Sequence, residues 1–115
     1  MRFALTRKDI ISLNQLFDDG NLLNEASLDF ALDYARKTQN WTKALAWIVR
    51  AILLDHVFEE GNKRTAALLI IAYAEYEGHA TYEDKVIKLI KKVILKKITS
   101  IARTEELIKD AIKVH

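Results

Sequence analysis

The sequence predicts an all-α fold, a compact bundle of about six helices, and three observations lead to this prediction. Apolar residues recur at helical spacing along most of the 115 residues. There is no proline, and the three glycines, Gly20, Gly61 and Gly78, stand where helices are expected to end. Hydrophobic residues make up 50% of the chain, which is enough for one core. We therefore expect residues 1–115 to form a single domain.

The helix boundaries follow from capping residues and from the apolar pattern. The first helix is expected to begin at Thr6, with Asp9 as the acid of a capping box, and to run to about Phe17 with Leu16 on its buried face. The later helices are expected as follows: one opening at Asn24 or Glu25, one over 41–55, one over 62–77 with Gly78 as its stop, one capped by Thr81 and one capped by Thr104.

Residues 41–55 and 62–77 are apolar on most sides, so we expect them to be two buried central helices joined by a polar loop. Within the first of them, Arg50 is expected at the surface, with a contact to Glu59 or Glu60 as the alternative. Tyr73 and Tyr76, in the second, are expected to pack rather than to stack on a nucleotide.

Composition and charge exclude several classes of protein. The absence of cysteine rules out a disulfide framework and a thiolate zinc site. No apolar run reaches the length of a membrane span, and the first residues are too short and too soon charged for a signal peptide. We expect a cytoplasmic protein without a membrane partner. The net charge of +2 is too small to require nucleic acid as a partner.

The fifth expected helix carries a basic stripe, because no acidic residue occurs between Lys85 and Arg103. Such a stripe is usually a solvated face. An acidic protein partner and nucleic acid remain as alternatives for it.

The polar run at 56–67, between the two central helices, contains residues that suit phosphate chemistry. His56 stands near the end of the preceding helix, and histidine can exchange a proton near neutral pH. Gly61 permits a backbone conformation closed to other residues, and Asn62 is a favoured N-cap. The free amides of residues 62–65 and the helix dipole are expected to form an anion site.

Charged side chains add to this site. Lys63 and Arg64 supply two cations suited to phosphate oxygens. Glu60 supplies a carboxylate, the ligand that Mg²⁺ prefers when it bridges a protein to nucleotide phosphates. Each feature alone is ordinary: a polar histidine, solvated turn glutamates, an exposed first turn of a helix. Their spacing between two apolar helices points to a polyphosphate site.

Residues 56–64 resemble the motif of the Fic/Doc family: histidine, any residue, phenylalanine, two residues of which the second is acidic, a small residue, asparagine, lysine or glycine, and arginine. Lys63 stands where adenylyl-transferring Fic proteins usually have glycine, and the run from Lys63 to Ala66 reads as in Doc-like proteins. Two positions depart from the relatives. Ala67 replaces the second arginine of Fic adenylyltransferases, and Gly61 is the Fic choice where Doc tends to alanine.

The resemblance implies a compact helical fold and a role for each motif residue. By that likeness His56 would be the general base for a hydroxyl on a target protein, and Glu60 would hold Mg²⁺. Gly61 and Asn62 would form the anion hole, and Lys63 and Arg64 would neutralise the phosphates. Phe58 would insert its ring into the core and so support the motif loop.

In the family, lysine in place of glycine goes with transfer of the terminal phosphate. The first expectation is therefore a Doc-like enzyme that moves phosphate from ATP to a Ser, Thr or Tyr hydroxyl of a protein, as the toxin of a toxin–antitoxin pair. Fic-type transfer of AMP is the near alternative. A catalytically silent domain that binds nucleotide or a partner, and a nucleic-acid binder that uses the lysine-rich helix, are the other two.

Two features of the family are not evident in the sequence. The link at 37–40 is too short for the hairpin flap that clamps a target segment in many relatives. The chain also has no Ser/Thr-x-x-x-Glu-Gly/Asn pattern of an inhibitory helix. A separate antitoxin-like partner would then have to supply the inhibitor.

Overall fold

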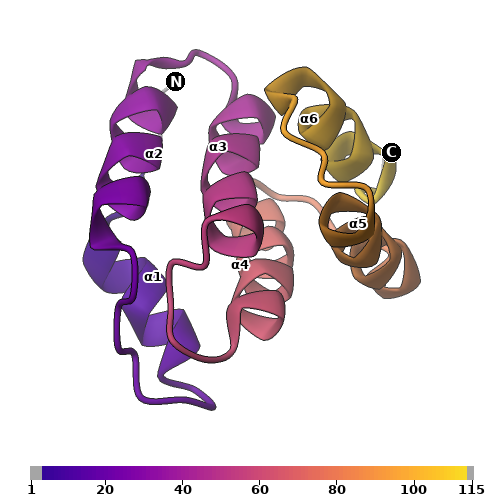
Figure 1. Ribbon diagram of the computed structural model, residues 1–115. Helices are drawn as coiled ribbons and strands as arrows, with labels where there is room; N and C mark the ends of the chain where they lie inside the picture. Colours follow the sequence, from indigo (N-terminus) through magenta and orange to yellow (C-terminus); the bar gives the residue numbers. More distant parts are fainter. Residues whose placement is uncertain (1–3, 114–115) are drawn as a thin grey trace.

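The computed structural model describes residues 4–113, which fold into six helices (Figure 1). These are α1 (Arg7–Asn14), α2 (Glu25–Lys37), α3 (Trp41–Leu54), α4 (Asn62–Tyr76), α5 (Glu83–Leu95) and α6 (Ile101–Asp110). The described residues contain no strand, only isolated bridges that join Leu22 to Phe58 and Thr81 to Ile112. The predicted all-α fold of about six helices is confirmed.

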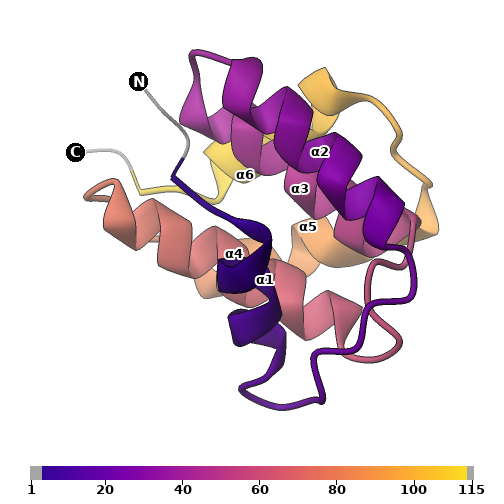
Figure 2. The same ribbon diagram turned by 90° about the vertical axis from the view of Figure 1, so that its left-hand side faces the viewer.

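Helix α3 forms the centre of the bundle. It contacts α2, α4, α5 and α6, and Figure 1 shows it between α2 on one side and the α5–α6 pair on the other. Leu45, Ile48 and Ile52 of α3 have no exposed surface. Helix α4 is covered on one face only, by α1, α3 and α5, so Ala72 is exposed while Ile70 is buried. Figure 2 shows α1 lying against α4.

The first helix is shorter than the sequence predicts. Thr6 is its N-cap and forms the expected capping box with Asp9, whose N–H donates to Thr6 Oγ1 at 3.3 Å. The helix ends at Asn14 instead of near Phe17, because the amides of Leu16 and Phe17 bond to carbonyls three residues back and tighten the last turn. Leu16 is 71% exposed, so its predicted place on the buried face is wrong.

The predicted caps of the last two helices are also wrong. Thr81 pairs with Ile112 in an isolated bridge, and α5 begins only after Tyr82. Ser100 is the N-cap of α6, and Thr104 lies inside the helix, where its hydroxyl donates to Ser100 O at 2.9 Å. Pairing with the C-terminal segment, which is distant in sequence, decides where α5 starts.

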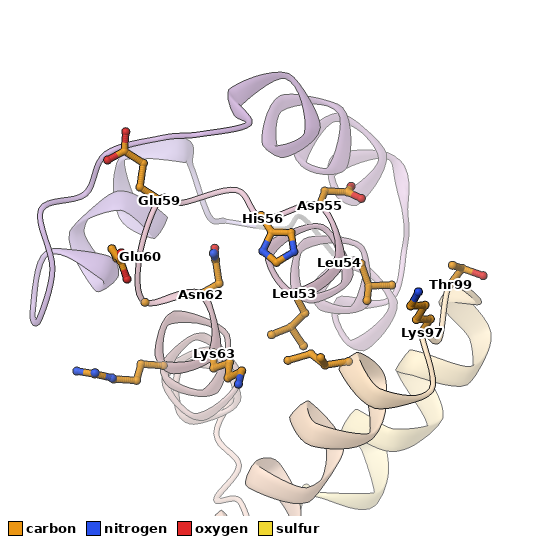
Figure 3. A pocket seen from close by; sticks show the side chains of 13 residues that line it. Leu53, Leu54, Asp55, His56, Glu59, Glu60, Asn62, Lys63, Lys97 and Thr99 are labelled. Atoms are coloured by element: carbon orange, nitrogen blue, oxygen red, sulfur yellow. The ribbon is translucent and has the colours of Figure 1, made fainter.

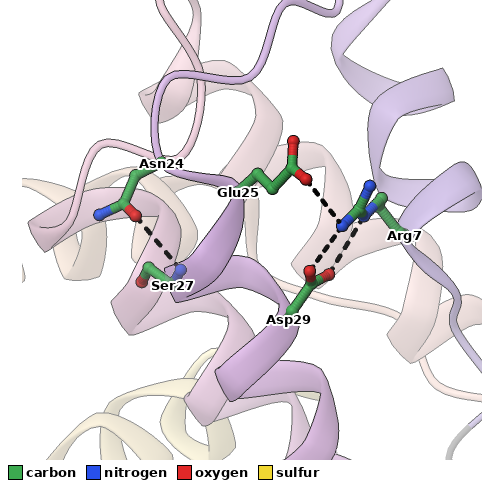
Figure 4. Close-up of polar contacts among 5 residues, drawn as sticks. All are labelled: Arg7, Asn24, Glu25, Ser27 and Asp29. Atoms are coloured by element: carbon green, nitrogen blue, oxygen red, sulfur yellow. Dashed lines mark hydrogen bonds and ion pairs between the residues drawn. The ribbon is translucent and has the colours of Figure 1, made fainter.

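Contacts between α1 and the start of α2 fix the segment that precedes the central helices (Figure 4). Arg7 Nη2 lies 2.5 Å from Asp29 Oδ2 and 3.4 Å from Glu25 Oε1. Asn24 caps α2, since its Oδ1 accepts the N–H of Ser27 at 3.2 Å. The ion pairs are exposed and add little stability, but they orient α1 on α2.

The predicted surroundings of Tyr73, Tyr76 and Arg50 are found only in part. Tyr73 is buried, with 3% of its surface exposed, whereas Tyr76 is 70% exposed and does not pack in the core. Arg50 Nη1 donates to Thr99 O at 2.7 Å, so the alternative contact with Glu59 or Glu60 is not formed. Among the described helices, none combines the length and hydropathy that a membrane span requires.

Candidate functional site

His56 follows the C-terminal end of α3 in a left-handed backbone conformation, with φ of +50°. The residue before it is held from α2: Asn24 Nδ2 donates to Asp55 O at 3.1 Å, and Ser27 Oγ donates to Asp55 Oδ2 at 2.5 Å. The left-handed conformation disfavours a side chain by roughly 1–2 kcal/mol. It turns the chain sharply at the end of α3 and leaves the imidazole exposed at the edge of a cavity (Figure 3).

The chain after His56 is anchored by an extended segment before α2. Leu23 N–H donates to Val57 O at 2.8 Å, and Glu59 N–H donates to Asn21 O at 3.1 Å. Between these bonds Phe58 is fully buried, with no exposed surface. A large buried ring and two backbone pairings therefore hold the motif loop against the core.

The side chain of Asn62 closes the loop on itself. Its Nδ2 donates to Phe58 O at 2.8 Å, and its Oδ1 accepts the N–H of Phe58 at 2.9 Å. Asn62 is the first residue of α4, and Gly61 is the N-cap, so the predicted capping role of Asn62 is wrong. The expected free amide of Thr65 is also wrong, because it donates to Gly61 O at 2.9 Å. The amides of residues 62–64 lie at the N-terminal end of α4, the end of a helix at which free backbone amides can bind an anion.

Gly61 occupies a crowded place with a left-handed backbone, where a side chain is disfavoured. Its φ is +77°, and a Cβ built on it would overlap Asp18 Oδ2 and approach Phe17 Cε2 to 2.9 Å. The glycine lets the chain pass close to the α1–α2 connection before α4 begins.

Asn14 supports the loop from the end of α1 and was missed by the sequence analysis. It is 1% exposed, and its Nδ2 donates to Glu60 O at 2.9 Å and to Thr65 Oγ1 at 3.0 Å. Its Oδ1 accepts the N–H of Gly20 at 2.8 Å. The only signal in the sequence is a polar residue beside the apolar positions of the first helix, and such residues are usually exposed.

The motif loop and the first turn of α4 line a cavity of about 840 Å³. This volume lies within the range of small-molecule sites, roughly 300–1,000 Å³. Leu53 and Leu54 of α3 and Ile94 of α5 form apolar parts of its wall. Lys97 and Thr99, from the turn between α5 and α6, line it as well, and no motif in the sequence marks them as site residues.

The predicted site residues are only partly brought together. His56, which follows α3, and Lys63 in the first turn of α4 both line the cavity (Figure 3). Glu60 also lines it, but Figure 3 shows its carboxylate beyond Asn62 and directed away from the imidazole. Arg64 lines the cavity too, and its Cζ lies 5.2 Å from the centre of the Phe17 ring.

Glu60 is the residue that the resemblance assigns to a magnesium ion, and Glu59 beside it also lines the cavity. The described residues hold no group of three or more His, Cys, Asp or Glu side chains that could bind a metal by themselves. Mg²⁺ at nucleotide sites typically takes one or two protein carboxylates and fills its other positions with phosphate oxygens and water. Glu60 is exposed and can rotate without disturbing the core, so the donor set fits an ion that arrives with a nucleotide.

The arrangement combines a solvent-accessible imidazole, a helix N-terminus and lysines around a cavity large enough for a nucleotide. Comparison with known proteins adds no family to this picture: no protein-family model, no curated protein and no solved structure matches the chain.

Proposed function

We propose that the chain is a Doc-like transferase that moves the terminal phosphate of ATP to a Ser, Thr or Tyr hydroxyl of a target protein. The observation that carries the proposal is that His56, Lys63 and the other first residues of α4 line one cavity of about 840 Å³. The resemblance of residues 56–64 to the Fic/Doc motif supports the same assignment. With ATP as co-substrate, we propose the cytoplasm as its compartment.

In this reaction His56 acts as the general base. The oxygen of the target hydroxyl attacks the γ-phosphorus of ATP, the proton of that hydroxyl passes to the imidazole, and the bond from the γ-phosphorus to the bridging oxygen breaks to release ADP. His56 is exposed at the cavity edge, so a hydroxyl on another protein can reach it.

Charge on the phosphates is balanced by the start of α4. Lys63 supplies a mobile point charge, and the amides of residues 62–64 supply fixed dipoles. Positioning and charge neutralisation supply most of the rate in phosphoryl transfer. Glu60 is the residue that would hold Mg²⁺, and the ion, when bound with the nucleotide, neutralises charge on the phosphate oxygens.

The test is incubation of the protein in cell lysate with ATP labelled separately at the α and γ phosphates. Transfer of the γ label to a protein band is expected, and transfer of the α label would establish the alternative, movement of AMP. His56→Gly is the best inactive variant, because glycine accepts the φ of +50° without strain. Loss of labelling in a variant at least as stable as the wild type assigns the loss to the imidazole.

A catalytically silent nucleotide-binding domain is the second candidate. It is favoured by the position of Glu60, directed away from the imidazole, and of Arg64, over Phe17. ATP binding with neither label transferred would support this candidate and end the transferase proposal. Glu60→Gln separates the two further: in an enzyme it lowers transfer at low Mg²⁺, and added Mg²⁺ restores part of the rate.

Regulation by a separate antitoxin-like protein belongs to the same proposal, because the sequence has no inhibitory-helix pattern of its own. The isolated chain is then expected to be active with ATP and Mg²⁺. An inactive chain that gains activity when residues 101–115 are deleted would instead place the inhibitor within this chain.

A further inference from the structure

The turn between α5 and α6 brings Lys97 to the cavity in an unusual backbone conformation. Lys97 has φ of +47°. Its N–H donates to Ile94 O at 3.3 Å, and the N–H of Ile98 donates to Val93 O at 3.0 Å. This pair of bonds is the pattern of a Schellman helix end, in which the left-handed residue is usually glycine because a Cβ is disfavoured there.

Helix α4 ends in the same pattern with the usual residue. Gly78 has φ of +87°, its N–H donates to Glu75 O at 2.9 Å, and the N–H of His79 donates to Ala74 O at 2.8 Å. The backbone at the end of α5 would accept glycine equally well. The end of α5 differs from the end of α4 in that its left-handed residue, Lys97, lines the cavity.

Arg50 holds this turn against α3. Its Nη1 donates to Thr99 O at 2.7 Å, and its Cζ lies 4.9 Å from the centre of the Trp47 ring. Trp47 in turn stacks on Tyr34 of α2, with ring centres 4.6 Å apart. A guanidinium that is both hydrogen-bonded and stacked has a defined position, so the turn that carries Lys97 is braced rather than loose.

The two lysines approach the cavity from different sides. Figure 3 shows Lys63 on α4 and Lys97 on the α5–α6 turn, with Leu53 between them. Three acidic residues line the cavity as well. Asp55 is bonded to Ser27, and Figure 3 shows Glu59 and Glu60 on the far side of Asn62 from Lys97. The positive charge therefore faces the cavity from two walls.

We propose that Lys97 is a phosphate-binding residue, which together with Lys63 selects ligands that carry two or more linked phosphates. A single phosphate at the start of α4 meets only Lys63, whereas a longer phosphate chain reaches both lysines. The ligand class is a nucleoside diphosphate or triphosphate, with inorganic polyphosphate as the other source of the same chemistry. The inference rests on the proposed function, because both place the phosphates of a nucleotide in this cavity.

The test is calorimetric titration of the full chain with ATP, AMP and inorganic tripolyphosphate. Lys97→Gly removes the charge and suits the backbone, so the variant is expected to be at least as heat-stable as the wild type. Its affinity for ATP should fall about tenfold, as for loss of one charge-assisted contact, while its affinity for AMP stays nearly unchanged. Lys96→Gln, at the exposed neighbouring residue outside the cavity, is the matched control.

The outcomes separate this inference from the proposed function. If Lys97→Gly binds ATP and tripolyphosphate as tightly as the wild type does, the proposed role of Lys97 is overturned, even where labelled phosphate is still transferred. If Lys97→Gly binds ATP more weakly while the wild type transfers no label, the role of Lys97 is supported and the transferase proposal is overturned. Weakened tripolyphosphate binding with ATP binding unaffected assigns the site to inorganic polyphosphate. A wild type that binds none of the three probes overturns both.

Discussion

The amide group of Asn62 forms hydrogen bonds with both backbone groups of one residue, Phe58: it accepts at 2.9 Å from the N–H and donates at 2.8 Å to the carbonyl. The side chain thus acts as a clamp across the motif loop. Because both ends of its amide are used in these bonds, the Asn62 side chain supports the proposed site indirectly, by holding the loop that carries His56 and Glu60.

Replacing Asn62 with Ala is therefore expected to destabilise the protein. Both bonds to Phe58 are lost and its partly buried backbone groups lose their partners, which costs roughly 1–3 kcal/mol. Urea unfolding measures the change. Lys63→Ala, at the exposed next position of α4, is the control and should change the free energy of unfolding by less than about 0.5 kcal/mol. Equal midpoints for the two variants would contradict the clamp.

The two helix-end glycines at 61 and 78 should respond differently to alanine. Both have positive φ, and forcing alanine into that region costs roughly 1–2 kcal/mol. A Cβ at 78 meets nothing within 4 Å, whereas one at 61 collides with Asp18 and Phe17. Gly61→Ala is therefore expected to lower the thermal midpoint clearly more than Gly78→Ala. Shortening the obstacle with Asp18→Gly in the Gly61→Ala background should recover part of the difference, and no recovery would count against this account.

Asn14 is expected to matter for stability and for the site together. Its replacement by Ala removes the partly buried hydrogen bonds to Glu60 O and from the Gly20 N–H. The loss should lower the free energy of unfolding by roughly 3 kcal/mol. The loss should appear in chemical unfolding, and labelling from ATP should weaken because the chain around Glu60 loosens. Ser12→Ala, on the exposed face of α1, is the comparison and should leave both measurements unchanged.

The buried phenol of Tyr73 is expected to make the folded protein less stable at alkaline pH. Burial raises the pKa of Tyr73 in the folded state. Because the folded protein holds the phenol proton more tightly, the stabilisation is complete below the unfolded value of about 10 and is lost as the pH rises through the folded pKa. Thermal midpoints measured from neutral pH to above pH 10 should fall less steeply in Tyr73→Phe than in wild type. Tyr76→Phe, at a position that is 70% exposed, should follow the wild type.

Helix ends that depend on bonds between near neighbours in the chain could be predicted from the sequence. The capping box of Thr6 and Asp9, the N-cap of α2 near Asn24 and the stop at Gly78 all follow from bonds between residues a few positions apart, and they are found as predicted. The caps expected at Thr81 and Thr104 use the same kind of reasoning, but distant pairing and an earlier serine replace them.

The sequence by itself determined the number of helices, the apolar character of α3 and the polar loop between α3 and α4, because periodicity and capping are local properties of a chain. Only the tertiary structure decided that Asn62 turns inward to Phe58, that Asn14 supports the loop and that Lys97 joins the cavity. Each of these depends on how a side chain from one element meets another, and that geometry is set by the packing of the whole core, which local spacing does not encode.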